Sequence, residues 1–437
     1  MSERRQRREA RRRIGRSRFR GRRRRWRPFP RPREGRRLRA ELRARHVGQL
    51  AETLHAGLND PGFETLLRRI DQAPIHARHR VDLFFRGEAA FDAMLAAIDG
   101  ATREVLVEAY ILKDDATGED LRQRLAAAVG RGVSVCVLAD AFGSAATRSS
   151  FWQTMEQQGI ELRLFNRPFA YLWYEPFRDH RKILVVDRQV AFTGGMNIGS
   201  EYRIARSAQE PAWRDTHVRV EGPTAWEMAV VFAEGWFRAG GRPLELEPLT
   251  PTRGEGARIL VLDSRPGRGH AESASVLAAI VGAAREQVWI TNAYFAPLPV
   301  TVSVLARAAE RGVDVRLLLP GRTDVPIVRH AGHGYFDELL QRGVRIFEYQ
   351  PTILHAKTLV ADGVVSVVGS SNLDFRSFRF NAECNLVILD EPAGREMTDA
   401  FSEDLRQSCE ITPSTWRRRL WLHRAGDRVA RLLSPLL

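Results

Sequence analysis

An imidazole and an ammonium group recur together at two places in this sequence of 437 residues. In each place a lysine follows the histidine by two residues, an aspartate by seven, a glycine by fourteen and an asparagine by seventeen. The two sets are His180, Lys182, Asp187, Gly194 and Asn197, and His355, Lys357, Asp362, Gly369 and Asn372. Histidine can act as a nucleophile or an acid–base group, and lysine can neutralise an anion. Identical offsets 175 residues apart predict one site built from two copies.

A β-strand running through each motif explains why these residue types occur together. Side chains alternate between the two faces of a strand, so His180 and Lys182 point to one side and Arg181 and Asp187 to the other. The second motif has the same alternation. Each copy therefore offers one imidazole and one ammonium group to a shared pocket. We expect each aspartate to lie behind its strand, where it ties the scaffold to a neighbour.

The elements that flank the two motifs occur in the same order. Apolar runs and helical periodicity predict alternating strands and helices over residues 81–240 and again over residues 257–410. Residues 241–256, rich in Gly, Pro and Thr, predict a linker, and residues 46–80 a helical lead-in. We expect an α/β fold of two duplicated halves, each a mixed, largely parallel sheet flanked by helices, packed with pseudo-twofold symmetry.

The pattern His-x-Lys-x4-Asp with a trailing Gly-x-x-Asn resembles the signature of the phospholipase D superfamily. Within it, the sequence is similar to the short bacterial cardiolipin synthases from about residue 81 to about residue 389. The similar phrases lie at residues 105–110, 194–198, 290–295 and 369–377. The resemblance implies phosphodiester chemistry on the duplicated, phospholipase D-like halves. It implies as catalytic residues His180, Lys182, Asp187, His355, Lys357 and Asp362.

A phosphodiester needs groups that neutralise its oxygens and a group that protonates the leaving alkoxide. Besides the two lysines, the candidate phosphate-binding residues are Asn197, Asn372, Gly195 and Ser370. No His, Asp or Glu cluster with metal-ligand spacing stands out, so we expect neither a metal nor a cofactor. By the resemblance, His180 attacks phosphorus to form a phosphohistidine, and His355 is the acid–base group.

A nucleophilic imidazole needs its second nitrogen fixed by a carboxylate or carbonyl group. Glu383 follows His355 by 28 residues, where the resembled family places such a carboxylate. In the first half the candidate is Asp215, 35 residues after His180. A surface salt bridge is the alternative role for either carboxylate.

The net charge of +15 is concentrated at the N-terminus. Residues 1–45 hold 22 Arg and four acidic residues, a balance of +18, so 15 − 18 leaves −3 for the rest. We expect a disordered Arg-rich tail over residues 1–45 that is attracted to anionic lipid headgroups. The alternatives are a solvated leader without a role, a transit peptide, and nucleic-acid binding, which we consider unlikely.

No apolar run reaches the roughly 18 residues of a membrane span, and the N-terminus lacks the apolar core of a signal peptide. The three cysteines lack CxxC spacing, as in a reducing compartment. We expect a peripheral protein on the cytoplasmic side of the cell membrane. The oligomeric state stays open.

Three further stretches bear on the substrate. Residues 168–177 are unusually aromatic and predict either buried packing or a hydrophobic lip for acyl chains. Glu108 is polar inside an apolar run and either lines the pocket or is structural. Residues 411–437 predict an amphipathic C-terminal helix that lies at a membrane interface, packs on the body or forms a dimer contact.

These patterns favour a phosphatidyltransferase that passes a phosphatidyl group between two phosphatidylglycerol molecules, giving cardiolipin and glycerol. The alternatives are a phospholipase D that uses water as acceptor, and a metal-independent phosphodiesterase or nuclease. A non-catalytic lipid or nucleic-acid binder fits least, because both motifs are complete.

Overall fold

The computed structural model describes residues 34–166, 177–205, 207, 210–246, 254–265, 269–419, 426, 427 and 429–431. Residues 41–437 form one compact unit, distinct from residues 1–40. Residues 1–33 of the expected tail and 168–176 of the aromatic stretch lie outside the described residues. No helix in the described part of the chain combines the length and the apolar character needed to cross a bilayer.

The first half alternates strands and helices, as the sequence predicts. Its elements are β1 (Ile75–Phe84), α4 (Gly87–Asp99), β2 (Glu104–Ala109), α5 (Ala116–Gly130), β3 (Ser134–Asp140), α6 (Ser149–Gln157), β4 (Glu161–Phe165), β5 (Lys182–Val186), β6 (Val190–Gly194), α7 (Ser200–Arg203), β7 (His217–Glu221) and α8 (Pro223–Arg238). Buried residues alternate along β2, where Val105 and Val107 join one core cluster and Leu106 joins another. This period of two is that of a strand packed on both faces.

The second half repeats the order with a few additional short elements. Its elements are β8 (Ala257–Ser264), α9 (His270–Ala283), β9 (Gln287–Asn292), β10 (Phe295–Ala296), α10 (Pro299–Glu310), β11 (Asp314–Pro320), α11 (Pro326–His333), α12 (Phe336–Gln341), β12 (Arg345–Tyr349), β13 (Lys357–Ala361), β14 (Val365–Gly369), β15 (Leu373–Asp374), β16 (Glu383–Leu389), α13 (Glu391–Arg406), β17 (Ser408–Ile411) and α14 (Pro413–Arg417).

One fifteen-stranded sheet runs through both halves in the order β17-β12-β11-β9-β13-β14-β16-β8-β1-β7-β6-β5-β2-β3-β4. Outward from the central β1–β8 pair, the strands of the two halves correspond one to one as far as β4 and β12, and the second half adds the edge strand β17. This correspondence is the internal duplication in space. The predicted mixed sheet is confirmed, but "largely parallel" is wrong. Only four strand pairs of the described sheet are parallel, namely β2–β3, β3–β4, β9–β11 and β11–β12. The other pairs of this sheet are antiparallel.

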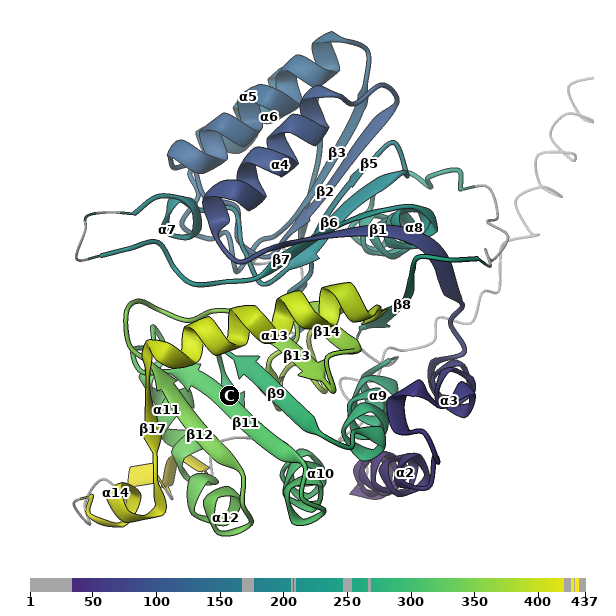
Figure 1. The fold of residues 1–437 in the computed structure, drawn as a ribbon. Coiled ribbons are helices and arrows are strands. Elements are labelled where there is room, and N and C mark those ends of the chain that lie inside the picture. The colour runs from purple at the N-terminus through teal and green to yellow at the C-terminus, as the bar shows by residue number, and fades with distance from the viewer. Residues whose placement is uncertain are drawn as a thin grey trace, which may run out of the picture. The chain divides into compact units, whose positions relative to one another are not determined.

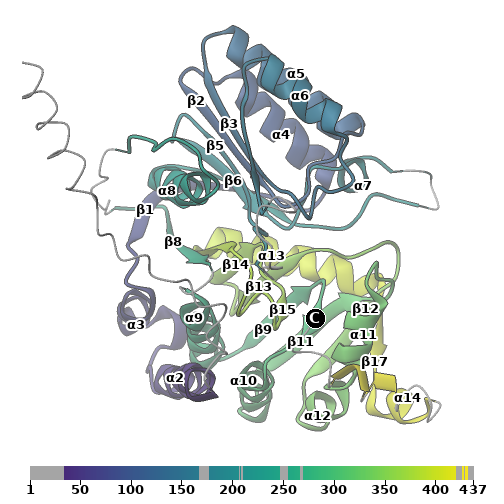
Figure 2. The ribbon, with the colours of Figure 1, turned by 180° about the vertical axis from the view of Figure 1, so that it is seen from behind.

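Helices cover both faces of the sheet (Figures 1 and 2). Helices α4, α5 and α6 pack on one face of the first half, and α9, α10 and α12 on one face of the second. Helices α8 and α13 share a third core cluster with strands of both halves. The apolar core between the halves therefore fixes the relative position of the two motif strands.

The lead-in consists of α2 (Glu34–Glu52), the short helix η1 (Gly57–Asn59) and α3 (Pro61–Asp71), which shares the core cluster of α9. Helix α2 starts before residue 46 and β1 before residue 81, so both expected boundaries shift toward the N-terminus. The start of β1 was missed because residues 75–80 contain His and Arg in place of an apolar alternation.

The described part of residues 411–437 is not one continuous helix. Strand β17 ends at Ile411 on the edge beside β12, and α14 ends at Arg417. Residues 426, 427 and 429–431 are helical, and the other residues beyond 419 lie outside the described part. The predicted membrane contact of this region stays a prediction.

The two motif aspartates occupy the turns after β5 and β13, at the ends of these strands away from the lysines. Asp187 accepts hydrogen bonds from the backbone N–H groups of Thr102, Arg103 and Glu104 at 2.8–2.9 Å. Asp362 likewise accepts from three successive backbone N–H groups, those of residues 285–287. Each carboxylate thus anchors a turn to the start of the neighbouring strand, and the catalytic role that the resemblance implies for Asp187 and Asp362 stays a prediction.

Replacing Asp187 with Asn should therefore reduce stability and leave the chemistry intact. The amide loses the charge that attracts three backbone N–H groups, so we expect the free energy of unfolding to fall by about 1–3 kcal/mol. Urea unfolding followed by circular dichroism measures the change, with the exposed Asp399→Asn as the matched control. Unchanged stability together with a large loss of activity per folded molecule would show that Asp187 acts in catalysis.

Candidate active site

The two histidine–lysine pairs stand at equivalent places in the sheet. Lys182 is the first residue of β5 and lies opposite Ala109, the last residue of β2. Lys357 begins β13 and lies opposite Asn292, the last residue of β9. Both pairs therefore lie at the carboxyl ends of strands that belong to the parallel parts of the sheet, where α/β folds place their ligands.

His180 contacts a carboxylate that comes from the second half. Its Nδ1 lies 3.0 Å from Oε2 of Glu383, the first residue of β16. The backbone N–H of His180 also donates to the carbonyl oxygen of Ala382 at 2.9 Å. With Nδ1 held in this way, Nε2 is the ring nitrogen left for chemistry.

His355 makes the reciprocal contact with the first half. Its Nδ1 lies 2.8 Å from Oδ2 of Asp215, and its backbone N–H donates to the carbonyl oxygen of Arg214 at 2.7 Å. Both orienting carboxylates predicted from the sequence are thus in place, but the pairing is crossed. Glu383 serves the histidine of the first half and Asp215 that of the second, so neither half contains a complete site.

Burial and mutual charge govern the protonation of this group. The His180 and His355 residues are 7% and 4% exposed. Desolvation lowers the pKa of His180 to about 4 and also lowers that of His355. Desolvation likewise lowers the pKa of Lys182 to about 7 and that of Lys357 to about 8. Each lysine also lowers the pKa of the opposite histidine, so both halves share one electrostatic environment.

Glu383 is held by three side-chain donors besides His180. The Ser370 hydroxyl donates to its carboxylate at 2.6 Å, the Ser377 hydroxyl at 2.8 Å and Nδ2 of Asn381 at 3.2 Å. Burial raises the pKa of Glu383, but His180, Lys182 and these hydrogen bonds together hold it below its ordinary value. The carboxylate stays ionised and keeps the His180 ring fixed.

Asp215 is held by close packing against a glycine. A Cβ atom on Gly195 would lie 2.1 Å from Oδ1 of Asp215, so only glycine leaves room for this carboxylate. The backbone N–H of Thr216 donates to the same oxygen at 2.7 Å. Burial raises the pKa of Asp215, but His355 and Lys357 more than offset this and lower it.

Two phosphate-binding candidates therefore have other contacts. The Ser370 hydroxyl donates to Glu383, and Gly195 lies against Asp215, so both support the carboxylates that orient the histidines. Sequence spacing could not reveal this, because Glu383 lies 13 residues after Ser370 on another strand. Phosphate contact by either residue stays a prediction.

Asn197 and Asn372 lie beside the two motifs as expected. Nδ2 of Asn197 donates to the Tyr202 hydroxyl at 2.8 Å, and that hydroxyl lies 3.5 Å from Nδ1 of His355. The side-chain oxygens of both asparagines are buried and have no hydrogen-bond partner among the described residues. A substrate hydroxyl could satisfy these acceptors, so their contact with substrate stays a prediction.

A relationship to known proteins is shown by sequence. The profile of the family described as "Cardiolipin synthase, PLD-like domain" matches residues 94–212 and 277–405, one segment around each motif. The chain is 39% identical over 380 residues to cardiolipin synthase A of Pseudomonas aeruginosa, covering 86% of this chain and 77% of that protein. Cardiolipin synthase A of Pseudomonas putida is 38% identical over 84% of this chain and 77% of its own length.

The chain belongs to the cardiolipin synthase family of phospholipase D-like proteins. Its fold is similar to that of phosphatidylserine synthase from Haemophilus influenzae, with a TM-score of 0.65 at 12% identity over 86% of this chain and all of the other. At that identity the likeness concerns the fold alone. The two family-matched segments contain both histidines, both lysines and Glu383 of the crossed pairs, and Asp215 lies three residues beyond the first segment.

Aromatic side chains that the sequence analysis did not assign to the site surround both histidines of this family member. Tyr110, directly after β2, packs edge-on to His180 at 4.8 Å between ring centroids. Tyr294, close after β9, packs edge-on to His355 at 5.8 Å. Tyr202 and Trp213 also contact the His355 ring. An Ala-Tyr dipeptide stands at the end of both strands, at residues 109–110 and 293–294. This repeat was the sequence signal that could have identified the two tyrosines.

Glu108 belongs to a buried ionic group behind the first motif strand. Arg181, which is 2% exposed, contacts the carboxylates of Glu108 at 3.5 Å and of Asp263 on β8. Burial, followed by the charge of Asp179, raises the pKa of Glu108 well above its ordinary value. Arg181 therefore connects Glu108 on β2 of the first half with Asp263 on β8 of the second, and Glu108 belongs to this ionic group.

The role of Ser370 can be tested by Ser370→Ala. Losing the hydroxyl loosens Glu383 and hence His180, so we expect kcat to fall about 10–100-fold with little change in KM. Steady-state kinetics on phosphatidylglycerol in mixed micelles separates the two parameters, with the exposed Ser150→Ala as control. A raised KM with unchanged kcat would instead indicate that Ser370 binds the phosphate in both ground and transition states.

Proposed function

We propose that the protein is a phosphatidyltransferase that moves a phosphatidyl group from one phosphatidylglycerol to a hydroxyl of another, releasing glycerol and forming cardiolipin. The observation that carries this proposal is the crossed pairing of two buried histidines with two carboxylates, beside two lysines. The family membership and the relatives named cardiolipin synthase A support the choice of substrate and acceptor.

In the first step neutral His180 attacks phosphorus through Nε2. Its low pKa, about 4, keeps the ring unprotonated at neutral pH, and Glu383 fixes Nδ1. A phosphorus–nitrogen bond forms as the bond from phosphorus to the glycerol oxygen breaks. His355 protonates the leaving oxygen, and Lys182 and Lys357 balance the charge of the phosphate. The bound anion favours the protonated state of His355, whose pKa is low in the empty site.

In the second step a hydroxyl of another phosphatidylglycerol attacks the phosphatidyl-histidine. His355, now neutral, takes the proton of this hydroxyl, and the phosphorus–nitrogen bond breaks to regenerate His180. The proton that His355 gave to glycerol is thus recovered from the acceptor. If water entered in place of the second lipid, the product would be phosphatidic acid.

The substrate lies in a membrane, so the active site must operate at a bilayer surface. We place the protein peripherally on the cytoplasmic face, where the +18 balance of residues 1–45 would be attracted to anionic lipids. The C-terminal residues 411–437 are the second proposed contact. The amino-acid composition of the two terminal regions supports both proposed membrane contacts.

The proposed reaction is tested by incubating the purified protein with vesicles of labelled phosphatidylglycerol and separating the lipids by thin-layer chromatography. Wild-type protein should yield cardiolipin and free glycerol. His180→Ala should give no covalent intermediate and no product. His355→Ala should lower turnover by about 10²–10⁴-fold, the usual contribution of an acid–base group.

The exposed His55→Ala is the matched control and should keep full activity. If phosphatidic acid were the main product, the protein would be a phospholipase D and not a transferase. Full activity of either active-site variant would contradict a shared two-histidine site.

A further inference from the structure

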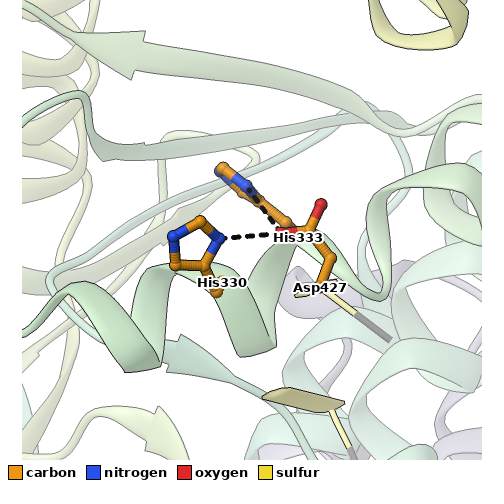
Figure 3. Close-up of side chains that lie close together, drawn as sticks. All are labelled: His330, His333 and Asp427. Carbon is orange, nitrogen blue, oxygen red and sulfur yellow. Dashed lines mark hydrogen bonds and ion pairs between the residues drawn. The ribbon is translucent and has the colours of Figure 1, made fainter. Parts of the chain in front are cut away.

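A second group of histidines and a carboxylate lies outside the active site. His330 and His333 are one turn apart on α11, and Asp427 comes from the helical residues near the C-terminus (Figure 3). One ligand atom from each of the three lies within 4.8 Å of the others. His333 and Asp427 are buried, and His330 is half-exposed. Spacing along the sequence could not reveal this group, because Asp427 lies 94 residues after His333.

Each ring nitrogen of His333 faces a carboxylate. Nδ1 of His333 lies 3.6 Å from Oδ1 of Asp427, and Nε2 lies 3.4 Å from Oε1 of Glu348. A neutral imidazole carries a single N–H, so it cannot donate to both carboxylates. A metal ion bound by Nδ1 and Asp427 resolves this conflict, because Nε2–H then donates to Glu348. An outer carboxylate of this kind is typical of metal-bound histidines.

The distances also match the spacing of ligands around a small cation. For zinc, with ligand bonds of about 2.0–2.1 Å, neighbouring tetrahedral ligand atoms are roughly 3.3–3.4 Å apart. The separation from Asp427 Oδ1 to His330 Nδ1 is 2.9 Å, a hydrogen bond that would lengthen when both atoms bind an ion, and the separation to His333 Nδ1 is 3.6 Å. The second distance is too long for a hydrogen bond but suits two ligands of one ion. Oδ2 of Asp427 is held by Arg419 at 2.8 Å.

We propose that His330, His333 and Asp427 form a zinc site, with water as the fourth ligand. Two imidazoles and one carboxylate are ligands that Zn²⁺ favours in proteins. His333 and Asp427 also line a cavity of about 370 Å³, which gives water and the ion access to the site.

The zinc ion would hold the C-terminal helical residues against α11. Ala430 packs in a small cluster with Ala296, Val328 and Ala331, and Tyr294 packs against the same cluster. Tyr294 is the residue whose ring contacts His355. The proposed site is therefore structural, and it lies on an element next to the active site without taking part in the chemistry.

The test uses the full chain after removal of metals with a chelator. Isothermal titration calorimetry with Zn²⁺ should show one binding site per chain in the wild type. Binding of Co²⁺ in place of Zn²⁺ should give the visible absorption spectrum of a tetrahedral complex. His330→Ala and Asp427→Asn should each weaken binding by at least about tenfold. His330 has a side chain that is 49% exposed, so its replacement does not endanger folding. Zn²⁺ should raise the melting temperature of the wild type but not of His330→Ala.

The exposed His55→Ala is the control for loss of a histidine elsewhere and should bind Zn²⁺ as the wild type does. Absence of Zn²⁺ binding by the wild type would overturn the proposal. Unchanged affinity in both His330→Ala and Asp427→Asn would also overturn it, because the ion would then bind elsewhere.

Discussion

The exchange of carboxylates between the two halves is the interaction on which the rest of the structure depends. Glu383 reaches His180, and Asp215 reaches His355, so each half orients the histidine of the other. Buried charges without partners are strongly destabilising, and this site contains two carboxylates and two lysines with almost no solvent. Each half contributes one lysine and one carboxylate, but each carboxylate meets its histidine only when the halves are together. The core that α8 and α13 share with strands of both halves holds them in that position.

The two halves are duplicated but not equivalent, and the differences fit two different roles. Glu383 accepts hydrogen bonds from Ser370, Ser377 and Asn381, whereas Asp215 is wedged against Gly195. The firmer support belongs to the carboxylate that orients His180, the proposed nucleophile. Behind the first motif strand, Arg181 adds a buried ionic contact with β8, and Ala356 occupies its place in the second motif. Glu383 thus has more side-chain donors than Asp215, and the first motif has an additional ionic contact with the second half.

The sequence was sufficient to identify the charged residues of the site but not the contacts between them. The repeated offsets identified both histidines and both lysines, and strand alternation correctly placed the motif aspartates away from them. Spacing along the chain does not show which loop crosses to the other half, so the crossing of Glu383 and Asp215 was not predictable. The contact of Ser370 with Glu383 was not predictable for the same reason. The alternating pattern of strands and helices gave the α/β class, but it overestimated the parallel share, because hairpins such as β5–β6 and β13–β14 add antiparallel strands.

Nuclear magnetic resonance of the histidine ring nitrogens measures the crossed pairing most directly. In ¹⁵N-labelled protein, the His180 and His355 signals can be assigned by their loss in the alanine variants. Glu383→Gln should shift the Nδ1 resonance of His180 and leave that of His355 nearly unchanged, and Asp215→Asn should do the reverse. If Glu383→Gln shifted His355 and spared His180, each half would orient its own histidine, and the crossed arrangement would be contradicted.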